Sequence, residues 1–326
     1  MKKIIMLLVV LCLLTGCGKY SEKDVVKDLE KKLDKNYKLS GELSINNNDE
    51  VYNYKVEVLY MKKDYYKVVL TNTSNDHTQI ILKNDDGVYV LTPSLNKSFR
   101  FQSDWPYNNS QIYLINAIIN DIKKDNKRKF TSSDNKYIIK TNVKYPNNTK
   151  LVNQKIVVSK DLKFEKVIVY DNNGSPVMNM IFDKIDYSPK ISKSDFKLDN
   201  IIKNNNESVK ETSNLEDTIY PLFVPSGTKL IDEKEINKDN GKRVIMNYDG
   251  EKSFVLVEET EDVFNEFTII PSYGEPCLLM DTLGVASTNS LSWNSGGIDY
   301  YLVSDVLSQT EMMEVASSIN GIVSTK

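Results

Sequence analysis

The sequence predicts an α+β protein in which a long antiparallel sheet with helices is followed by a second, smaller unit. Three observations support this prediction. Polar and apolar residues alternate in a series of short segments, three other segments have apolar residues at helical spacing, and one polar stretch divides the chain. The chain has 326 residues, of which 40% are hydrophobic, so it is long enough to form two domains with real cores.

The first residues have the pattern of a secretory signal. Two lysines precede an apolar run over residues 4–14, which is about half the length that a membrane-spanning helix needs. The run ends in small residues before Cys17, and this order resembles the lipobox of bacterial lipoproteins. The resemblance implies cleavage between Gly16 and Cys17 and a diacylglycerol on the Cys17 sulfur. We therefore expect a signal peptide at 1–16 and an extracytoplasmic protein anchored to the cell or spore membrane, although an ordinary secretory signal with an incidental cysteine is the alternative.

The segments after a first expected helix at 21–35 have a period of two. In residues 52–60, apolar side chains occupy every second position, as they do in a strand with one buried face. Turn residues separate similar segments, which predicts an antiparallel meander. The strands expected in this unit span residues 52–60, 65–70, 78–82, 87–91, 98–101, 137–143, 151–158, 164–170 and 176–183.

A second helix and a linker complete the expected organisation. Residues 110–123 carry isoleucines in a wide stripe, which predicts a helix buried against the sheet. A polar stretch predicts a linker at 201–215, between a first domain at 17–200 and a small C-terminal α/β domain at 216–326. The elements expected in the second domain are strands at 244–248, 254–257, 264–270 and 297–303 and a helix at 308–319.

Side chains that commonly carry catalysis are scarce. The one histidine, His77, is expected on the surface, and Cys277, the one cysteine left after processing, is expected to be a buried structural thiol. The acidic pair at 258–259, like those at 49–50 and 85–86, is expected to be solvated loop charge. Glycine loops for phosphate and basic patches for nucleic acid are lacking. We therefore expect no catalytic residues, no cofactor and no metal site, although a pair of distant carboxylates acting as in a glycosidase stays open.

One stretch resembles a known family. The residues DGVYVLTP at 86–93, KSFRFQSDWP at 97–106 and SQIYL at 110–114 follow the lipobox in order. This combination resembles the germination and sporulation lipoproteins of the GerS/YdcC type from spore-forming Firmicutes. The sheet with an inserted helix resembles the LolA/LolB/RseB-like lipoprotein-sorting fold, in which a curved antiparallel half-barrel wraps around helices. A weaker similarity at 291–319 points to a small domain appended to some of these lipoproteins.

The resemblance implies a function without catalysis. It suggests a lipid-anchored envelope protein of sporulation or germination that binds a cortex- or peptidoglycan-modifying enzyme, such as an amidase. Trp105 and Tyr113 are the candidates for a cavity or partner surface, with core packing as the alternative for Trp105. The second function left open is a carrier or sensor of a lipid or lipoprotein acyl chain in the half-barrel, although a permanent anchor argues against a shuttling carrier. Tyrosines that stack on glycan rings are a further alternative.

Overall fold

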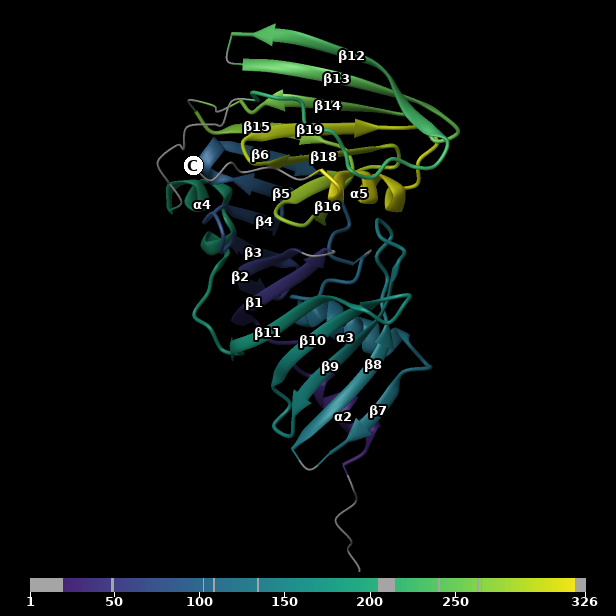
Figure 1. The fold of residues 1–326 in the computed structure, drawn as a ribbon. Helices are drawn as coiled ribbons and strands as arrows, with labels where there is room; N and C mark the ends of the chain where they lie inside the picture. The colour runs from purple at the N-terminus through teal and green to yellow at the C-terminus, as the bar shows by residue number, and fades with distance from the viewer. Residues whose placement is uncertain are drawn as a thin grey trace, which may run out of the picture.

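The computed structural model describes residues 20–47, 50–101, 103–107, 109–133, 135–204, 215–239, 241–262, 264 and 266–319. The expected signal peptide at 1–16, the expected lipidation site Cys17 and residues 205–214 of the expected linker lie outside the described residues. Figure 1 shows an elongated molecule in which β7 lies at one end and β12 at the other. The described part of the chain is mostly β, so the expected α+β class is confirmed only in outline.

A mixed sheet of twelve strands forms the first layer, in the order β15-β6-β5-β4-β3-β2-β1-β11-β10-β9-β8-β7. Neighbouring strands are antiparallel except β15, which runs parallel to β6. Every strand expected from 52 to 183 is present. The strands span β1 Tyr37–Asn47, β2 Glu50–Met61, β3 Tyr65–Asn72, β4 Thr78–Asn84, β5 Gly87–Thr92, β6 Lys97–Phe101, β7 Lys129–Ser132, β8 Lys136–Asn142, β9 Leu151–Ser159, β10 Phe164–Asp171, β11 Pro176–Asp186 and β15 Thr268–Ser272.

Helices α2 (Glu22–Glu30) and α3 (Ile115–Lys124) contribute to the main core with one face of this sheet. Ser21 accepts a hydrogen bond from the Asp24 N–H and completes a capping box, which fixes where α2 begins. α3 begins five residues later than the expected helix at 110–123, because residues 110–114 form an extended turn whose apolar side chains are buried without helical backbone.

The outer face of β3–β5 is covered separately. The 3-10 helix η2 (Lys193–Phe196) and helix α4 (Leu198–Asn204) pack there, and Phe196 and Ile201 join a small cluster with Tyr65, Ile80 and Leu91. Helix α4 includes residues 201–204 of the expected linker. The predicted division at 201–215 otherwise stays a prediction.

The second unit is an antiparallel sheet and not the expected α/β domain. Its order is β12-β13-β14-β19-β18-β17-β16, and helix α5 (Gln309–Ser317) packs on it. A Ser308 capping box fixes the start of α5, as expected. The α/β expectation failed because four strands of this sheet, β12 and β16–β18, were not recognised in the sequence. The strands span β12 Thr228–Lys238, β13 Gly241–Gly250, β14 Phe254–Thr260, β16 Glu275–Leu278, β17 Leu283–Ala286, β18 Ser290–Ser295 and β19 Ile298–Val303.

The two sheets are interlocked. The segment expected as a strand at 264–270 is β15, which pairs with β6 of the first sheet although it follows β14 of the second. Leu283 and Val285 of β17 are buried in the main core of the first unit, and the Tyr54 hydroxyl donates to the Met280 carbonyl at 2.6 Å. Within the described part of the chain, no helix has both the length and the apolarity to cross a membrane.

Candidate functional site

A cavity of about 180 Å³ lies where the two sheets meet. The first sheet contributes side chains from β4, β5, β6 and the 3-10 helix η1 (Pro93–Leu95), and the second contributes side chains from β14, β17, β18 and β19. The polar part of the lining includes Gln79, Thr92, Lys97, Glu259, Glu261 and Asp299, whereas Phe99 and Tyr301 contribute aromatic side chains. The cavity therefore combines charged groups with ring surfaces, as small-molecule sites do.

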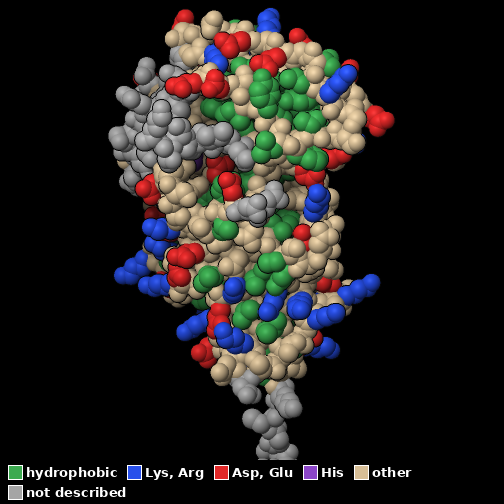
Figure 2. All heavy atoms as spheres, viewed as in Figure 1, with side chains coloured by type: hydrophobic (Ala, Val, Ile, Leu, Met, Phe, Trp, Pro, Cys, Tyr) green, Lys and Arg blue, Asp and Glu red, His purple; other side chains and the backbone are tan. Residues whose placement is uncertain are grey.

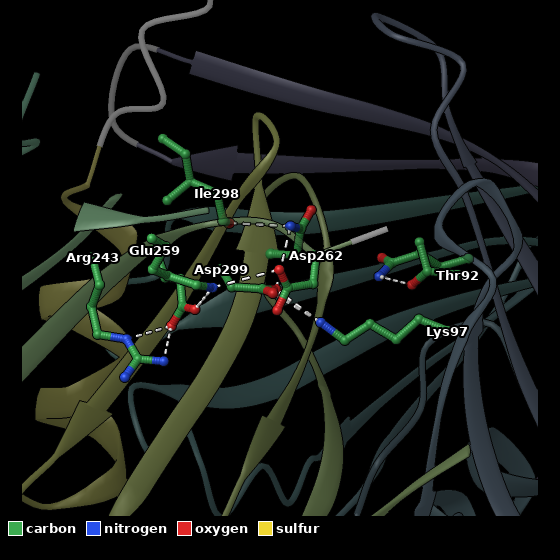
Figure 3. Close-up of polar contacts among 10 residues, drawn as sticks. Thr92, Lys97, Arg243, Glu259, Asp262, Ile298 and Asp299 are labelled. Atoms are coloured by element: carbon green, nitrogen blue, oxygen red, sulfur yellow. Dashed lines mark hydrogen bonds and ion pairs between the residues drawn. The ribbon is translucent and has the colours of Figure 1, made fainter. Parts of the chain in front are cut away.

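Lys97 and Asp299 form an ion pair across the junction of the sheets. The Lys97 ammonium donates to both Asp299 oxygens, at 3.1 Å to Oδ1 and 3.0 Å to Oδ2, and Lys97 is only 7% exposed. Figure 3 shows the Lys97 side chain extending toward Asp299 from the opposite side of the site. A lysine this deeply buried needs an opposite charge, so the pair holds β6 against β19.

Glu259 pairs with cations of β12 and β13 and not with Lys97. Arg243 donates to it through Nε at 2.7 Å and approaches through Nη2 at 2.6 Å, and the Lys238 ammonium also binds its carboxylate. Figure 3 shows Arg243 and Glu259 facing one another beside Asp299. Two cations on one carboxylate leave Glu259 little capacity for a further partner.

Glu261 differs from the other carboxylates of the site. It is 4% exposed, and its Oε1 atom has no hydrogen-bond partner among the residues that the structure describes. Burial first, and then the charge of Asp299, raise the pKa of Glu261 to about 8, although Lys97 acts in the opposite direction. At neutral pH this carboxyl group is therefore mostly protonated and is available to a partner from outside the chain.

Aromatic side chains lie on both faces of the second sheet at this point. Trp293 and Tyr300 are cross-strand neighbours on β18 and β19, their rings stack with centroids 5.0 Å apart and planes 9° apart, and they belong to the core under α5 on the face away from Glu259 and Asp299. Tyr301 is on the cavity face and is 45% exposed at the outer edge of the site. A ligand that enters beside Tyr301 would meet its ring and that of Phe99.

The size of the cavity limits what it can hold. A protonated carboxyl group near ionised ones is also the pattern of glycoside hydrolases, which is the alternative that the sequence left open. A cavity of about 150 Å³ holds one benzene ring, and the present cavity of about 180 Å³ is little larger. A glycosidic bond joins two rings, so the cavity itself would hold only one of them. Among the described residues, no three His, Cys, Asp or Glu side chains are placed to hold a metal ion.

Trp105 lies away from this cavity. It is fully buried in the main core, its ring packs edge-on against Tyr66 with centroids 5.7 Å apart, and its carbonyl accepts a hydrogen bond from Lys83 at 2.7 Å. The structure thus places Trp105 as an anchor of the loop between β6 and α3, the alternative that the sequence allowed. Tyr107, two residues further on, is 52% exposed, and its hydroxyl donates a hydrogen bond to the Asp64 carboxylate.

Tyr113 and Cys277 line a second, smaller cavity of about 40 Å³ between the first sheet and α5. Burial raises the pKa of the Cys277 thiol to about 12, so this cysteine is a buried, unreactive thiol as expected. His77 precedes β4 and is half-buried, and its backbone N–H donates to Asn75 at 2.9 Å. The structure brings neither Trp105, Tyr113 nor His77 into the larger cavity.

The acidic pair at 258–259 is not solvated loop charge, and that expectation was wrong. Both residues lie within β14, where Glu258 is fully buried and accepts a hydrogen bond from the Ile219 N–H at 2.9 Å. Glu259 faces the opposite side of the strand and the cavity. The alternation Phe254, Leu256, Glu258 could have indicated that Glu258 points inward, because side chains two apart on a strand share a face.

Comparisons with known proteins place the chain in a family. No protein-family model matches the sequence. Over 320 residues the chain is 37% identical to the sporulation protein YdcC of Bacillus subtilis (strain 168), and the alignment covers 96% of this chain and 95% of the relative.

Similar solved structures are more distant. A chain of the Pseudomonas aeruginosa MucA/MucB complex shares 11% identity, with 90% of this chain and 98% of that chain covered and a TM-score of 0.34. A putative outer membrane lipoprotein-sorting protein domain from Vibrio parahaemolyticus shares 11% sequence identity, with 55% of this chain and 97% of that chain covered and a TM-score of 0.33. A chain of the Clostridioides difficile complex between the CwlD amidase and the GerS lipoprotein shares 18% sequence identity, with 53% of this chain and 95% of that chain covered and a TM-score of 0.21. By its identity to the Bacillus subtilis relative over nearly the whole of both chains, the protein belongs to the family of the sporulation protein YdcC.

Proposed function

We propose that the chain is a non-catalytic, lipid-anchored envelope protein that acts in sporulation or germination by binding a cortex- or peptidoglycan-modifying enzyme, such as an amidase. Its family membership supports the role in sporulation. The lipobox-like order that ends at Cys17 supports the anchor and an extracytoplasmic location. The partner class follows from the resemblance of residues 86–114 to the GerS/YdcC lipoproteins.

The separation of charge between the two units is the observation that carries a binding role. Residues 20–204 contain 31 Lys and Arg against 24 Asp and Glu, a net formal charge of +7, whereas residues 216–319 contain 6 against 19, a net charge of −13. Figure 2 shows Lys and Arg gathered over the part of the molecule that contains β7–β11 and a greater share of Asp and Glu over the second sheet. A field of this kind steers a basic partner to the second sheet.

The first described residues lie against the basic unit, which indicates which unit would be next to the membrane. The ring of Tyr20 lies 6.1 Å from that of Tyr137 on β8, and Glu22 pairs with Arg128 beside β7 at 2.7 Å. A lipid on Cys17, three residues before Tyr20, would hold the basic unit next to the membrane. Lysines near an anionic surface contribute about 1 kcal/mol each, so the acidic second sheet would face away from the membrane toward its partner.

A carrier of acyl chains is supported less well. In a LolA-like half-barrel, the ligand would lie between the curved sheet and the helices. In this chain that interior is filled by a continuous core, in which Leu39, Val58 and Tyr66 pack with Ile118 and Ile122 of α3. An acyl chain could enter only if these buried side chains moved apart.

A binding experiment with charge-reversal variants tests the proposal. The chain from residue 18 onward is titrated with a peptidoglycan amidase from the same organism, at low salt and at 0.5 M salt. The double variant Asp232→Lys/Glu235→Lys reverses two exposed charges on β12, and Glu42→Lys/Asp183→Lys makes the same change on the basic unit. We expect the first variant to weaken binding at least tenfold and the second to leave it within twofold. Equal affinity of both variants would refute the assignment of the partner to the acidic sheet. Acyl chains that co-purify with the protein would favour the carrier instead.

A further inference from the structure

The charges around the intersheet cavity balance only when Glu261 is neutral. Glu259, Asp262 and Asp299 supply three negative charges, and Lys97, Lys238 and Arg243 supply three positive charges that pair with them. Glu261 is a fourth carboxyl group that lines the same cavity, with one oxygen that accepts no hydrogen bond from the described residues. The site thus has room for one additional positive charge.

The rest of the cavity limits what can carry this charge. Phe99 and Tyr301 line the cavity with aromatic side chains, and the volume of about 180 Å³ corresponds to one six-membered ring with a substituent. Aromatic faces attract organic cations, and the attraction is stronger at sites shielded from water. An anion would instead meet the unpaired carboxyl group, and an acyl chain would be far longer than the cavity.

We propose that this cavity binds a small organic ammonium ion, whose nitrogen pairs with the Glu261 carboxylate and whose ring-sized body packs against Phe99 and Tyr301. The ligand enters past Tyr301, which is exposed, and Asp299, which is partly exposed. Its pairing with Glu261 leaves the Lys97–Asp299 and Arg243–Glu259 pairs in place. The proposal is independent of the identity of the protein partner, since it concerns the junction of the sheets and not the outer surface.

Binding of a cation to this site is coupled to loss of one proton. The groups that face Glu261 are Asp299 and Asp262, which favour its protonated form, and Lys97 and Asn294, which favour its ionised form. Because the carboxyl group must ionise to pair with an ammonium ion, each ligand that binds releases one proton at pH values below about 8. The affinity should therefore rise about tenfold per pH unit from pH 6 to 8 and then level off, until the amine itself deprotonates near a pKa of about 10.4.

Calorimetric titration of the full chain in detergent tests this proposal. Cyclohexylammonium is the probe, and cyclohexanol is the neutral control of the same size. We expect the wild-type protein to bind cyclohexylammonium at least tenfold more tightly than cyclohexanol at pH 8, with the stated dependence on pH. Absence of binding by the ammonium probe, equal binding of cyclohexanol, or an affinity that does not change from pH 6 to 8 would each overturn the proposal.

Matched variants locate the site. Glu261→Gln keeps the shape of the side chain and removes its charge, so it should weaken cyclohexylammonium binding at least tenfold. Glu266→Gln makes the same chemical change at an exposed position and should bind as the wild type does. Glu261→Asp keeps the charge on a shorter stem and should retain part of the affinity. Circular dichroism confirms that each variant is folded before it is titrated. Undiminished binding by folded Glu261→Gln protein would refute the site.

Discussion

Glu258 is a carboxyl group buried in the core of the second sheet, and it should make the stability of the protein depend on pH. The residue has no exposed surface, its Oε2 accepts the Ile219 N–H at 2.9 Å, and its Oε1 has no hydrogen-bond partner among the described residues. Burial raises the pKa of Glu258 from the usual 4.5 to about 7. The folded chain therefore holds this proton over a range of pH in which the unfolded chain has already lost it.

The sign and size of the effect follow from this difference in pKa. Below about pH 4.5 both states are protonated, and the full stability is present. As pH rises toward 7 the unfolded state is ionised while the folded state still holds its proton, so the free energy of unfolding falls by about 1.4 kcal/mol per pH unit. Between pH 4.5 and 7 the loss amounts to about 3 kcal/mol, a large part of the roughly 5–15 kcal/mol typical of a folded domain.

Glu258→Gln should abolish this dependence, because the amide does not ionise. Urea denaturation followed by far-ultraviolet circular dichroism at pH 5, 6, 7 and 8 gives the free energy of unfolding for both proteins. We expect the wild type to lose about 3 kcal/mol relative to the variant between pH 5 and 8. Any fixed cost of the amide cancels in this comparison, as does the titration of Glu261, which both proteins share. Glu266→Gln is the matched exposed control. Parallel pH curves for wild type and Glu258→Gln would show that the carboxyl group is ionised in the folded core and that the reasoning is wrong.

Five other substitutions have expected outcomes. Trp105→Ala should lower the free energy of unfolding by about 3–5 kcal/mol in urea denaturation, because it empties a site filled by a fully buried ring, whereas Tyr107→Ala should change it by about 1 kcal/mol at most. Gly41→Ala should destabilise by about 1–3 kcal/mol in the same assay, because the added β carbon would lie 2.2 Å from a backbone oxygen of β11; unchanged stability would mean that the two strands separate easily. Cys17→Ala should leave the protein unprocessed or shed and Cys277→Ala should keep it on the membrane, as membrane fractionation would show.

Several of the strands that the sequence predicted have one buried face. In β2 the side chains of Tyr54, Val56 and Val58 are buried and those between them are exposed. Apolar and polar residues therefore alternate in the sequence of a strand of this kind. Strand β1 has the same pattern but was missed, because Gly41 interrupts it at the place where the register with β11 shifts. β12 was missed for another reason. Its side chains are exposed on both faces, so no periodic signal exists.

The cavity could not be predicted from local sequence. Lys97 and Asp299 are 202 positions apart, and nothing near either residue indicates that they meet. The burial of Glu261 depends on both sheets, and a glutamate at the end of a strand ordinarily remains in water. Trp105 was ambiguous in the sequence for the opposite reason, since a large aromatic residue at a turn fits either a core or a binding surface. The burial of Glu261 and the core position of Trp105 both depend on contacts between segments that are distant in the sequence.

The path of the chain explains why the cavity lies where it does. After β14 the chain leaves the second sheet, joins the first as β15, and returns to the second as β16. Glu261 is the first residue after β14, at the point where this excursion begins, and its N–H donates to the Gly297 carbonyl before β19. The Asn96 side chain donates to the Phe264 carbonyl at 2.8 Å and holds the outgoing segment against the turn before β6. Because one short segment is fixed to both sheets, a change in their relative position must move Glu261 relative to Lys97. A ligand that pairs with Glu261 would in turn favour one position of the acidic sheet over others, which would couple the cavity to the surface proposed to meet the partner.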